Sequence, residues 1–300
     1  MRRYRAHDAF VAPARLRSSL LLLVLGFTAI ELGHYATYDL IDALLLARRP
    51  DWLTAFYTGA TPLGLMAQLM SFAGLGGFVV LVARLVHKRS AASLTGPPRQ
   101  ALRQFLAVLW PLAALLLVIE ILPPWWSRDA LDHSRPLAAW LWLLPAALMA
   151  IFVQIAAEEL LYRGYLQQQL AALFARPVVW LVLTNLAFAL AHWTLAASPV
   201  ASLHYAIWAF AFGLCASDLT ARAGTLGPAL AFHMANNAFA FLLYGEAGGP
   251  SSGFALFLFA PETLAPALGA ETPLLANGQL AQELAVLGLM WLAARRALTR

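Results

Sequence analysis

Apolar residues occur in eight long runs along the chain, separated by shorter segments that carry most of its charges. The runs span 18–47, 62–83, 105–122, 137–162, 178–197, 201–220, 226–244 and 279–294. At about 1.5 Å per helical residue, each run can cross ~30 Å of hydrocarbon, the last one only with its flanks. A further apolar segment, 254–260, is cut by Pro261 and Glu262 and is too short to span, so we expect it at the membrane interface. The pattern predicts an all-α polytopic membrane bundle of about eight transmembrane helices.

Composition excludes a soluble globular protein, because 61% of the 300 residues are hydrophobic and only 12% are charged. Basic residues exceed acidic ones by 20 to 15, but they gather at the ends of apolar runs. They therefore indicate membrane topology and no nucleic-acid partner. The single cysteine, Cys215, allows neither a disulfide framework nor a cysteine-based metal site. Because no repeat or soluble segment interrupts the pattern, we expect one membrane domain over residues 1–300.

The basic residues also predict how the chain is oriented. An even number of spans puts both termini on one side, and sixteen of the twenty Lys and Arg residues then fall on that side. Cytoplasmic connections are enriched in such residues, so we expect both termini in the cytoplasm. The first run lacks a convincing cleavage site and is expected to remain as a span. Lys88 is the only lysine, a bias typical of GC-rich bacterial coding, which favours a bacterial inner membrane.

Two adjacent carboxylates, Glu158 and Glu159, lie near the end of the fourth run, and Arg163 follows Glu159 by four residues. A charge inside a bilayer costs about 2.5 to 3.5 kcal/mol on insertion scales, so such residues usually have a function. On a helix, Arg163 shares a face with Glu159 and can hold it ionised. Glu158 points about 100° away and is free for chemistry. The alternative is an ordinary helix end at the interface, with solvated glutamates.

Two further polar pairs occur inside later runs, each with a spacing that places its members on one helix face. Phe188 and His192 form the first pair, and Asn185 lies on nearly the same face. His233 and Asn237 form the second pair. A lone intramembrane histidine is about as often a hydrogen-bonded interior residue as a catalytic one. Three polar groups on three spans together favour a single functional site.

One glutamate, two histidines and an amide supply what hydrolysis of an acyl bond by water needs. These are a base for water, an imidazole that orients it or binds a metal, and donors for the developing oxyanion. Glu158, His192 and His233 are also a plausible zinc ligand set, although the helix signature H-E-x-x-H is absent. Neither G-x-S-x-G nor paired aspartates in a G-x-G-D setting occurs, so no serine arrangement competes.

These motifs resemble those of the CPBP or ABI family, the CAAX-processing and bacteriocin-processing intramembrane endopeptidases. The family motifs E-E-x-x-x-R, F-x-x-x-H and H-x-x-x-N or D match, in order, Glu158, Glu159 and Arg163, then Phe188 and His192, then His233 and Asn237. The resemblance covers residues 137–244, which would form the catalytic core. It implies hydrolysis of a peptide bond near the end of a membrane-anchored or lipid-modified protein or peptide.

The resemblance also implies a role for each matching residue. Glu158 would activate water together with His192, while His233 and Asn237 would stabilise the oxyanion. Supporting residues would be Glu159, Arg163 and Phe188. Because the family is described both as glutamate-type and as metal-dependent, zinc stays open as a cofactor, with Glu158, His192 and His233 as its ligands.

Functions of two other classes fit the same composition. A catalytically silent membrane scaffold or regulator would share the fold, but this chain retains every candidate catalytic residue. A proton-coupled transporter would use intramembrane Glu, Arg and His as a relay, but the inverted repeat expected of it is absent from the sequence. We therefore favour a protease whose partners are the lipid bilayer and a membrane-anchored substrate.

Three expectations concern other parts of the chain. Glu31, His34 and Asp39 recur near helical spacing in the first run and should form a satisfied polar cluster or, alternatively, a second functional site. The segment 164–174, with three consecutive glutamines, should be a short amphipathic stretch on the cytoplasmic face. Counted along its span, His192 lies about 21 Å from the cytoplasmic end and the other site residues at roughly 10 Å, but the motif predicts that helix tilt or a sunken entry point brings them level.

Overall fold

The computed structural model describes residues 4–46, 48–122, 131–193, 198–260 and 278–299. Its helices are α1 (Arg5–Arg15), α2 (Leu20–Leu45), α3 (Pro50–Thr58), α4 (Pro62–Leu85), α5 (Ala92–Thr95), α6 (Pro98–Ile121), α7 (Leu137–Glu159), α8 (Gln167–Leu173), α9 (Pro177–Ala191), α10 (Pro199–Ala223), α11 (Gly227–Leu242) and α13 (Gly278–Leu298). Helix α7 continues into α8 through η3, a π-helical segment (Leu160–Leu166). Three short strands are β1 (Leu131–Ser134), β2 (Tyr244–Glu246) and β3 (Phe257–Phe259).

Five helical stretches are long and apolar enough to cross a membrane. They are α2, α4, α5 with α6, α7 through α8, and α10. Each coincides with one of the predicted apolar runs, and the other three runs form α9, α11 and α13, of 15, 16 and 21 residues. The protein is thus an all-α, multi-pass membrane bundle, as the apolar pattern predicts. The count of eight spans stays a prediction.

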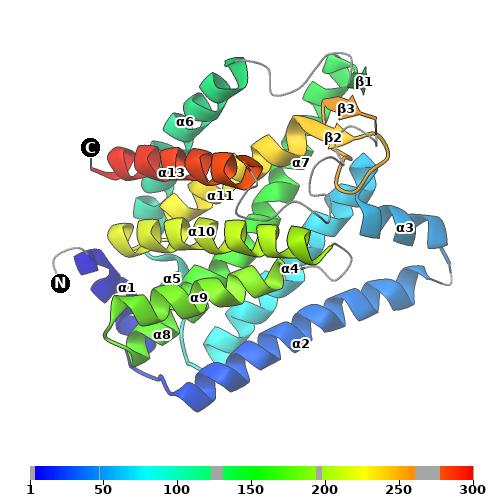
Figure 1. The fold of residues 1–300 in the computed structure, drawn as a ribbon. Helices are drawn as coiled ribbons and strands as arrows, with labels where there is room; N and C mark the ends of the chain where they lie inside the picture. Colours follow the sequence, from blue (N-terminus) through cyan, green and yellow to red (C-terminus); the bar gives the residue numbers. More distant parts are fainter. Residues whose placement is uncertain (1–3, 47, 123–130, 194–197, 261–277, 300) are drawn as a thin grey trace.

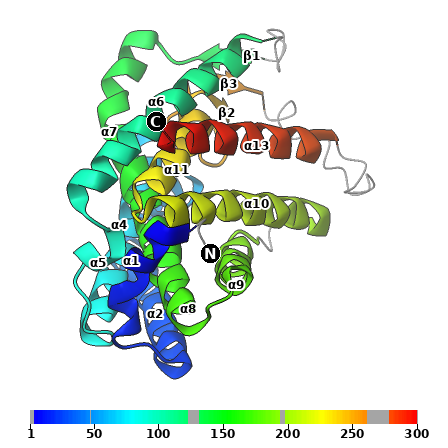
Figure 2. The ribbon, with the colours of Figure 1, turned by 90° about the vertical axis from the view of Figure 1, so that its left-hand side faces the viewer.

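The helices pack in pairs. Helix α4 packs along α7, α6 along α11, and α9 along α10, while α2 lies on the outer side of α4 (Figure 1). Helices α10 and α13 run side by side (Figure 2). Near the end of α10, the Asp218 carboxylate accepts hydrogen bonds from the Tyr4 hydroxyl and from Trp291 Nε1. The first and last helices therefore meet on one side of the bundle, as an even number of spans requires.

A small sheet lies on the side of the bundle away from the termini (Figure 1). Strand β3 is central, antiparallel to β1 and parallel to β2. The guanidinium of Arg135 donates to the carbonyl oxygens of Gly253 and Ala255 and so ties the sheet to the start of α7. The apolar segment 254–260 thus pairs its backbone in a sheet. Three-residue strands are too short to show an alternating pattern, so the sequence does not predict them.

The segment 164–174 is not an amphipathic surface stretch, and this expectation is wrong. Its three glutamines are fully buried. Gln167 Nε2 donates to the Ser217 carbonyl oxygen and lies 3.2 Å from His7 Nε2, and Gln168 Oε1 accepts from Arg89. Burial lowers the pKa of His7 to about 4, so the ring is neutral in this contact. The glutamines are buried because α1 covers α8, and Gln167 and Gln168 find polar partners on other elements, which the local sequence does not reveal.

Candidate functional site

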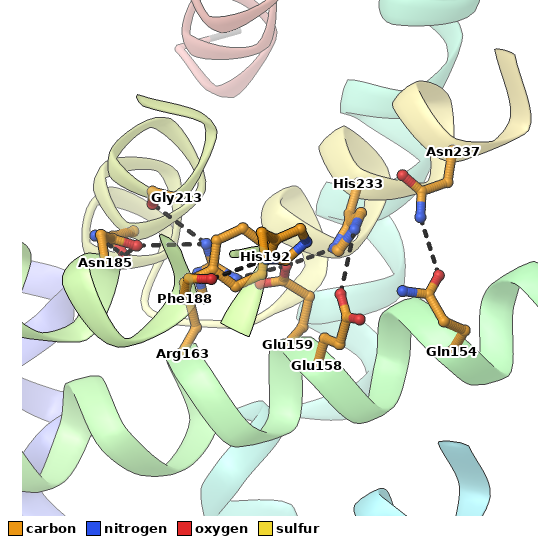
Figure 3. Close-up of polar contacts among 11 residues, drawn as sticks. Gln154, Glu158, Glu159, Arg163, Asn185, Phe188, His192, Gly213, His233 and Asn237 are labelled. Atoms are coloured by element: carbon orange, nitrogen blue, oxygen red, sulfur yellow. Dashed lines mark hydrogen bonds and ion pairs between the residues drawn. The ribbon is translucent and has the colours of Figure 1, made fainter. Parts of the chain in front are cut away.

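The predicted site residues meet inside the bundle (Figure 3). Helix α7 supplies two glutamates at its end, η3 supplies the arginine, α9 ends at the first histidine, and α11 carries the second. The side chains are Glu158, Glu159, Arg163, Phe188, His192 and His233. A π-helical segment changes the direction in which successive side chains point, and such segments are frequent at functional sites.

Glu159 and Arg163 form the predicted ion pair. Arg163 Nη1 donates to Glu159 Oε1 at 3.0 Å, and neither side chain has any exposed surface. Arg163 Nη2 donates to the Gly213 carbonyl oxygen at 3.3 Å, and the guanidinium lies 4.6 Å from the centre of the Phe188 ring. Two ionised groups without water are tolerated only when other contacts complete their solvation. Helices α9 and α10 supply part of these contacts here, while Arg163 Nε and Glu159 Oε2 have no hydrogen-bond partner among the described residues.

His233 stands between the two glutamates. Its Nδ1 lies 2.8 Å from Glu159 Oε1, and its Nε2 lies 3.6 Å from Glu158 Oε2. An ionised carboxylate only accepts, so Nδ1–H donates to Glu159 and fixes the ring with Nε2 toward Glu158. Glu159 therefore both neutralises Arg163 and orients the histidine. Spacing within one helix predicts the Arg163 contact but cannot show this contact between α7 and α11.

His192 is held by its own helix. Its Nδ1 lies 2.8 Å from the Phe188 carbonyl oxygen and donates to it, which leaves Nε2 as an acceptor. No hydrogen bond or ion pair joins His192 to Glu158 within the described ranges. The Phe188 ring centre lies 4.4 Å from that of His192 and 6.4 Å from that of His233. Through this shared ring, the two histidines lie near each other.

The fifth predicted span is shorter than its apolar run. Helix α9 starts at Pro177 and ends at Ala191, so His192 caps the helix and does not continue a long span. Residues 194–197 lie outside the described part of the chain. Counting residues from Val178 along an upright helix puts His192 deeper than the other groups. The shared contact with Phe188 places its ring near that of His233, as the motif predicts.

Asn237 lies one turn beyond His233 and does not contact it through a hydrogen bond in the part of the chain that is described. Its Nδ2 donates to Gln154 Oε1 at 2.9 Å, and its Oδ1 accepts from Asn236 Nδ2 at 3.0 Å. Gln154, one turn before Glu158, was not among the predicted site residues. The signal that points to it is its position four residues before Glu158 in an apolar helix.

The three polar residues of the first span, Glu31, His34 and Asp39, do not share one environment. The His34 ring packs against Phe72 of α4, with ring centres 5.5 Å apart, and Asp39 is exposed. The predicted satisfied cluster does not form among the described residues, because His34 Nδ1 is buried without a hydrogen-bond partner. Helix α2 packs on α4, which in turn packs on α7.

The zinc ligand set does not fit this arrangement. Within the described ranges, no group of three or more His, Cys, Asp or Glu side chains is placed to hold a metal ion. The contacts of His233 Nδ1 with Glu159 and of His192 Nδ1 with the Phe188 carbonyl group leave only the two Nε2 atoms as nitrogen ligands. Glu158, His192 and His233 do not converge on one point as ligands must.

The fold and the site define a multi-pass helical membrane protein with a buried glutamate and histidine centre. Residues 140–239, which contain every motif residue, match the model of a family described as type II CAAX prenyl endopeptidase, Rce1-like. This family is the same as the CPBP or ABI family, and the match covers 100 of the 300 residues. The match supports an intramembrane endopeptidase in general.

Among curated proteins, the chain is similar to the uncharacterized protein YyaK of Bacillus subtilis strain 168. The two are 28% identical over 235 residues, which cover 75% of this chain and 71% of the relative. No solved structure matches the chain significantly.

Proposed function

We propose that this protein hydrolyses a peptide bond near the end of a membrane-anchored or lipid-modified protein, with water activated by Glu158 and His192. The observation that carries the proposal is Glu158 Oε2, a buried carboxylate oxygen that lacks a hydrogen-bond partner among the described residues. A buried polar atom left unpaired costs about 1 to 3 kcal/mol. Binding of the attacking water at this oxygen would remove that cost.

In the proposed reaction, Glu158 takes a proton from water while the water oxygen attacks the carbonyl carbon of the peptide bond. His192 Nε2, which the Phe188 contact leaves as an acceptor, orients the same water. The carbonyl oxygen becomes an oxyanion, which the ring of His233 and the amide of Asn237 stabilise. The C–N bond then breaks, and Glu158 returns its proton to the leaving amine.

To donate to the oxyanion, His233 needs a proton on Nε2 in addition to the one on Nδ1, because Nδ1–H is bound to Glu159 and Nε2 is on the side of the ring that faces Glu158. The Glu159 carboxylate would stabilise that doubly protonated ring in a setting where water is excluded. The substrate class rests on the family description and on the membrane helices that surround the site.

The test separates the chemistry from the fold. Glu158→Gln keeps the size and polarity of the side chain but cannot accept a proton from water. Loss of a general base lowers rates by about 10² to 10⁴. We expect Glu158→Gln to accumulate normally and to leave substrates uncleaved, with His192→Ala behaving similarly.

Substrates are first identified by comparing the termini of membrane proteins from cells with and without the gene. Cleavage of a co-expressed substrate is then followed on a gel, with the amount of enzyme measured in the same membranes. Gln167→Met, a buried change on the same continuous helix but outside the site, is the matched control and should cleave normally. Full cleavage by Glu158→Gln would overturn the proposal and favour a scaffold or regulator.

A further inference from the structure

Gln154 and Asn237 form a second polar link between α7 and α11, one helical turn from the link between Glu158 and His233 (Figure 3). Gln154 is 7% exposed, in a helix that is otherwise apolar before the two glutamates. A buried amide in such a helix needs a partner, and Gln154 Oε1 has one in Asn237 Nδ2 at 2.9 Å. The position lies outside the three family motifs, so nothing in them assigns it a role.

We propose that Gln154 is a positioning residue that sets the orientation of the Asn237 amide for the reaction. This inference rests on the proposed function, in which Asn237 donates to the oxyanion. The terminal torsion of an asparagine has two similar minima, which exchange its oxygen and its nitrogen. Two contacts select one of them here: Gln154 Oε1 accepts from Nδ2, and Asn236 Nδ2 donates to Oδ1.

The selected orientation leaves one donor for the substrate. The amide nitrogen of Asn237 carries two hydrogens, and Gln154 takes only one of them. The second is then available to an oxyanion formed between Glu158 and His233. If the amide turned over, its oxygen would face the oxyanion and repel it. Gln154 therefore acts through Asn237, whose half-buried side chain has no helix backbone partner to hold it.

A merely structural role predicts a different result. Hydrogen bonds between membrane helices contribute little to stability on average, because the alternative state also finds partners. Removal of one oxyanion donor, in contrast, lowers kcat by about 10² to 10³. If the Asn237 donor is misoriented rather than removed, kcat should fall by only part of that factor. The effect of losing Gln154 should therefore appear in kcat and hardly in the amount or thermal stability of the enzyme.

The variant to test is Gln154→Met, which keeps the length of the side chain and removes both the donor and the acceptor of its amide. We expect kcat to fall about 10- to 100-fold with KM within about 2-fold, because the loss concerns the transition state. The measurement uses the purified full chain in lipid vesicles and a substrate found by comparing membrane-protein termini. Gln167→Met is the matched control, since it removes a buried, hydrogen-bonded amide of the same size from the same continuous helix.

A double-mutant cycle then shows whether Gln154 acts through Asn237. In an Asn237→Ala background, Gln154→Met should cause no further loss of kcat. The inference would be overturned if the losses of kcat in the two single variants multiplied in the double variant. It would also be overturned if Gln154→Met kept the wild-type kcat, or if only the abundance of the enzyme fell. These outcomes are distinct from failure of the proposed function, because that failure would appear as full activity of Glu158→Gln.

Discussion

At the scale of single residues, Arg163 connects most parts of the site. Its guanidinium contacts the carboxylate of Glu159, a carbonyl group of α10 and the ring of Phe188. Glu159 in turn orients His233. A charge that is enclosed in this way cannot be removed without leaving its partner uncompensated in an apolar interior.

We expect Arg163→Ala to reduce both the amount of folded protein and its activity. Breaking a buried ion pair by removing one partner costs about 3 to 5 kcal/mol. Arg163→Lys should restore these properties only in part, because a lysine ammonium cannot donate to Glu159 and Gly213 in the geometry of a planar guanidinium. Thermal unfolding in detergent and the level of protein in membranes measure the effect.

The matched control for Arg163 is Arg15→Ala. Arg15 also pairs with a carboxylate, that of Asp8, but both side chains are exposed. Exposed pairs contribute about 0 to 1 kcal/mol, so this change should be nearly silent. Normal stability and full activity of Arg163→Ala would contradict the pairing argument.

The sequence predicts those contacts of the site that lie within one helix. Glu159 and Arg163 are four residues apart, and this spacing is sufficient to predict their ion pair. It does not predict that His233 contacts Glu159 or that Gln154 contacts Asn237, because both contacts join α7 to α11. Such contacts depend on how helices cross, and one sequence contains no direct record of that.

At the scale of elements, the approach of α10 to α9 holds the acceptors of Arg163 in place. Gly213 lies where the two helices meet, and a Cβ there would lie 2.3 Å from Asn185 Oδ1 and 3.2 Å from Asn185 Cβ. Asn185 cannot move aside freely, since its Nδ2 donates to the Leu181 carbonyl oxygen and to Ser217 Oγ. Only glycine allows this separation of the helices.

We therefore expect Gly213→Ala to push α9 and α10 apart and to lower stability by about 1 to 3 kcal/mol, the usual cost of overpacking. Gly77→Ala is the control, because a Cβ at Gly77 on α4 meets no atom within 4 Å. That change should be neutral or slightly stabilising, since alanine favours a helix more than glycine does. Equal melting temperatures for the two variants would show that the helices can separate without cost.

The limits of the apolar pattern also appear at this scale. It predicts the long helices well, because a run of about twenty apolar residues has few other stable structures in a membrane. It predicts neither the π-helical segment η3, which extends the helix past the end of the apolar run at residue 162, nor the end of α9 at Ala191, since the apolar run there extends to residue 197. It also fails for the buried glutamines of α8, since the partners of Gln167 come from α1 and α10 and those of Gln168 from α5 and the connection before it.

At the scale of the whole molecule, basic residues gather where the first and last helices meet. A groove of about 610 Å³ at this end is lined by Arg222, Leu292, Arg295, Arg296, Leu298 and Thr299. Arg222 donates to Asp218, which also binds groups from α1 and α13. Arginines near the ends of spans favour the cytoplasmic side. The end of the bundle that carries both described termini is therefore the end predicted to face the cytoplasm.

This orientation is tested by labelling single cysteines in a chain whose Cys215 is replaced by alanine. Three exposed positions serve: Asp51 in the first connection, Ser90 in the second, and Thr299 at the end of the last helix. A membrane-impermeant maleimide should label Asp51→Cys in intact cells, whereas Ser90→Cys and Thr299→Cys should react only after lysis. The reason is that sixteen of the twenty basic residues then lie in cytoplasmic segments or toward the cytoplasmic ends of spans, as the membrane insertion machinery favours. Labelling of Thr299→Cys in intact cells, with Ser90→Cys still protected, would require an odd number of spans and would show that the count of eight is wrong.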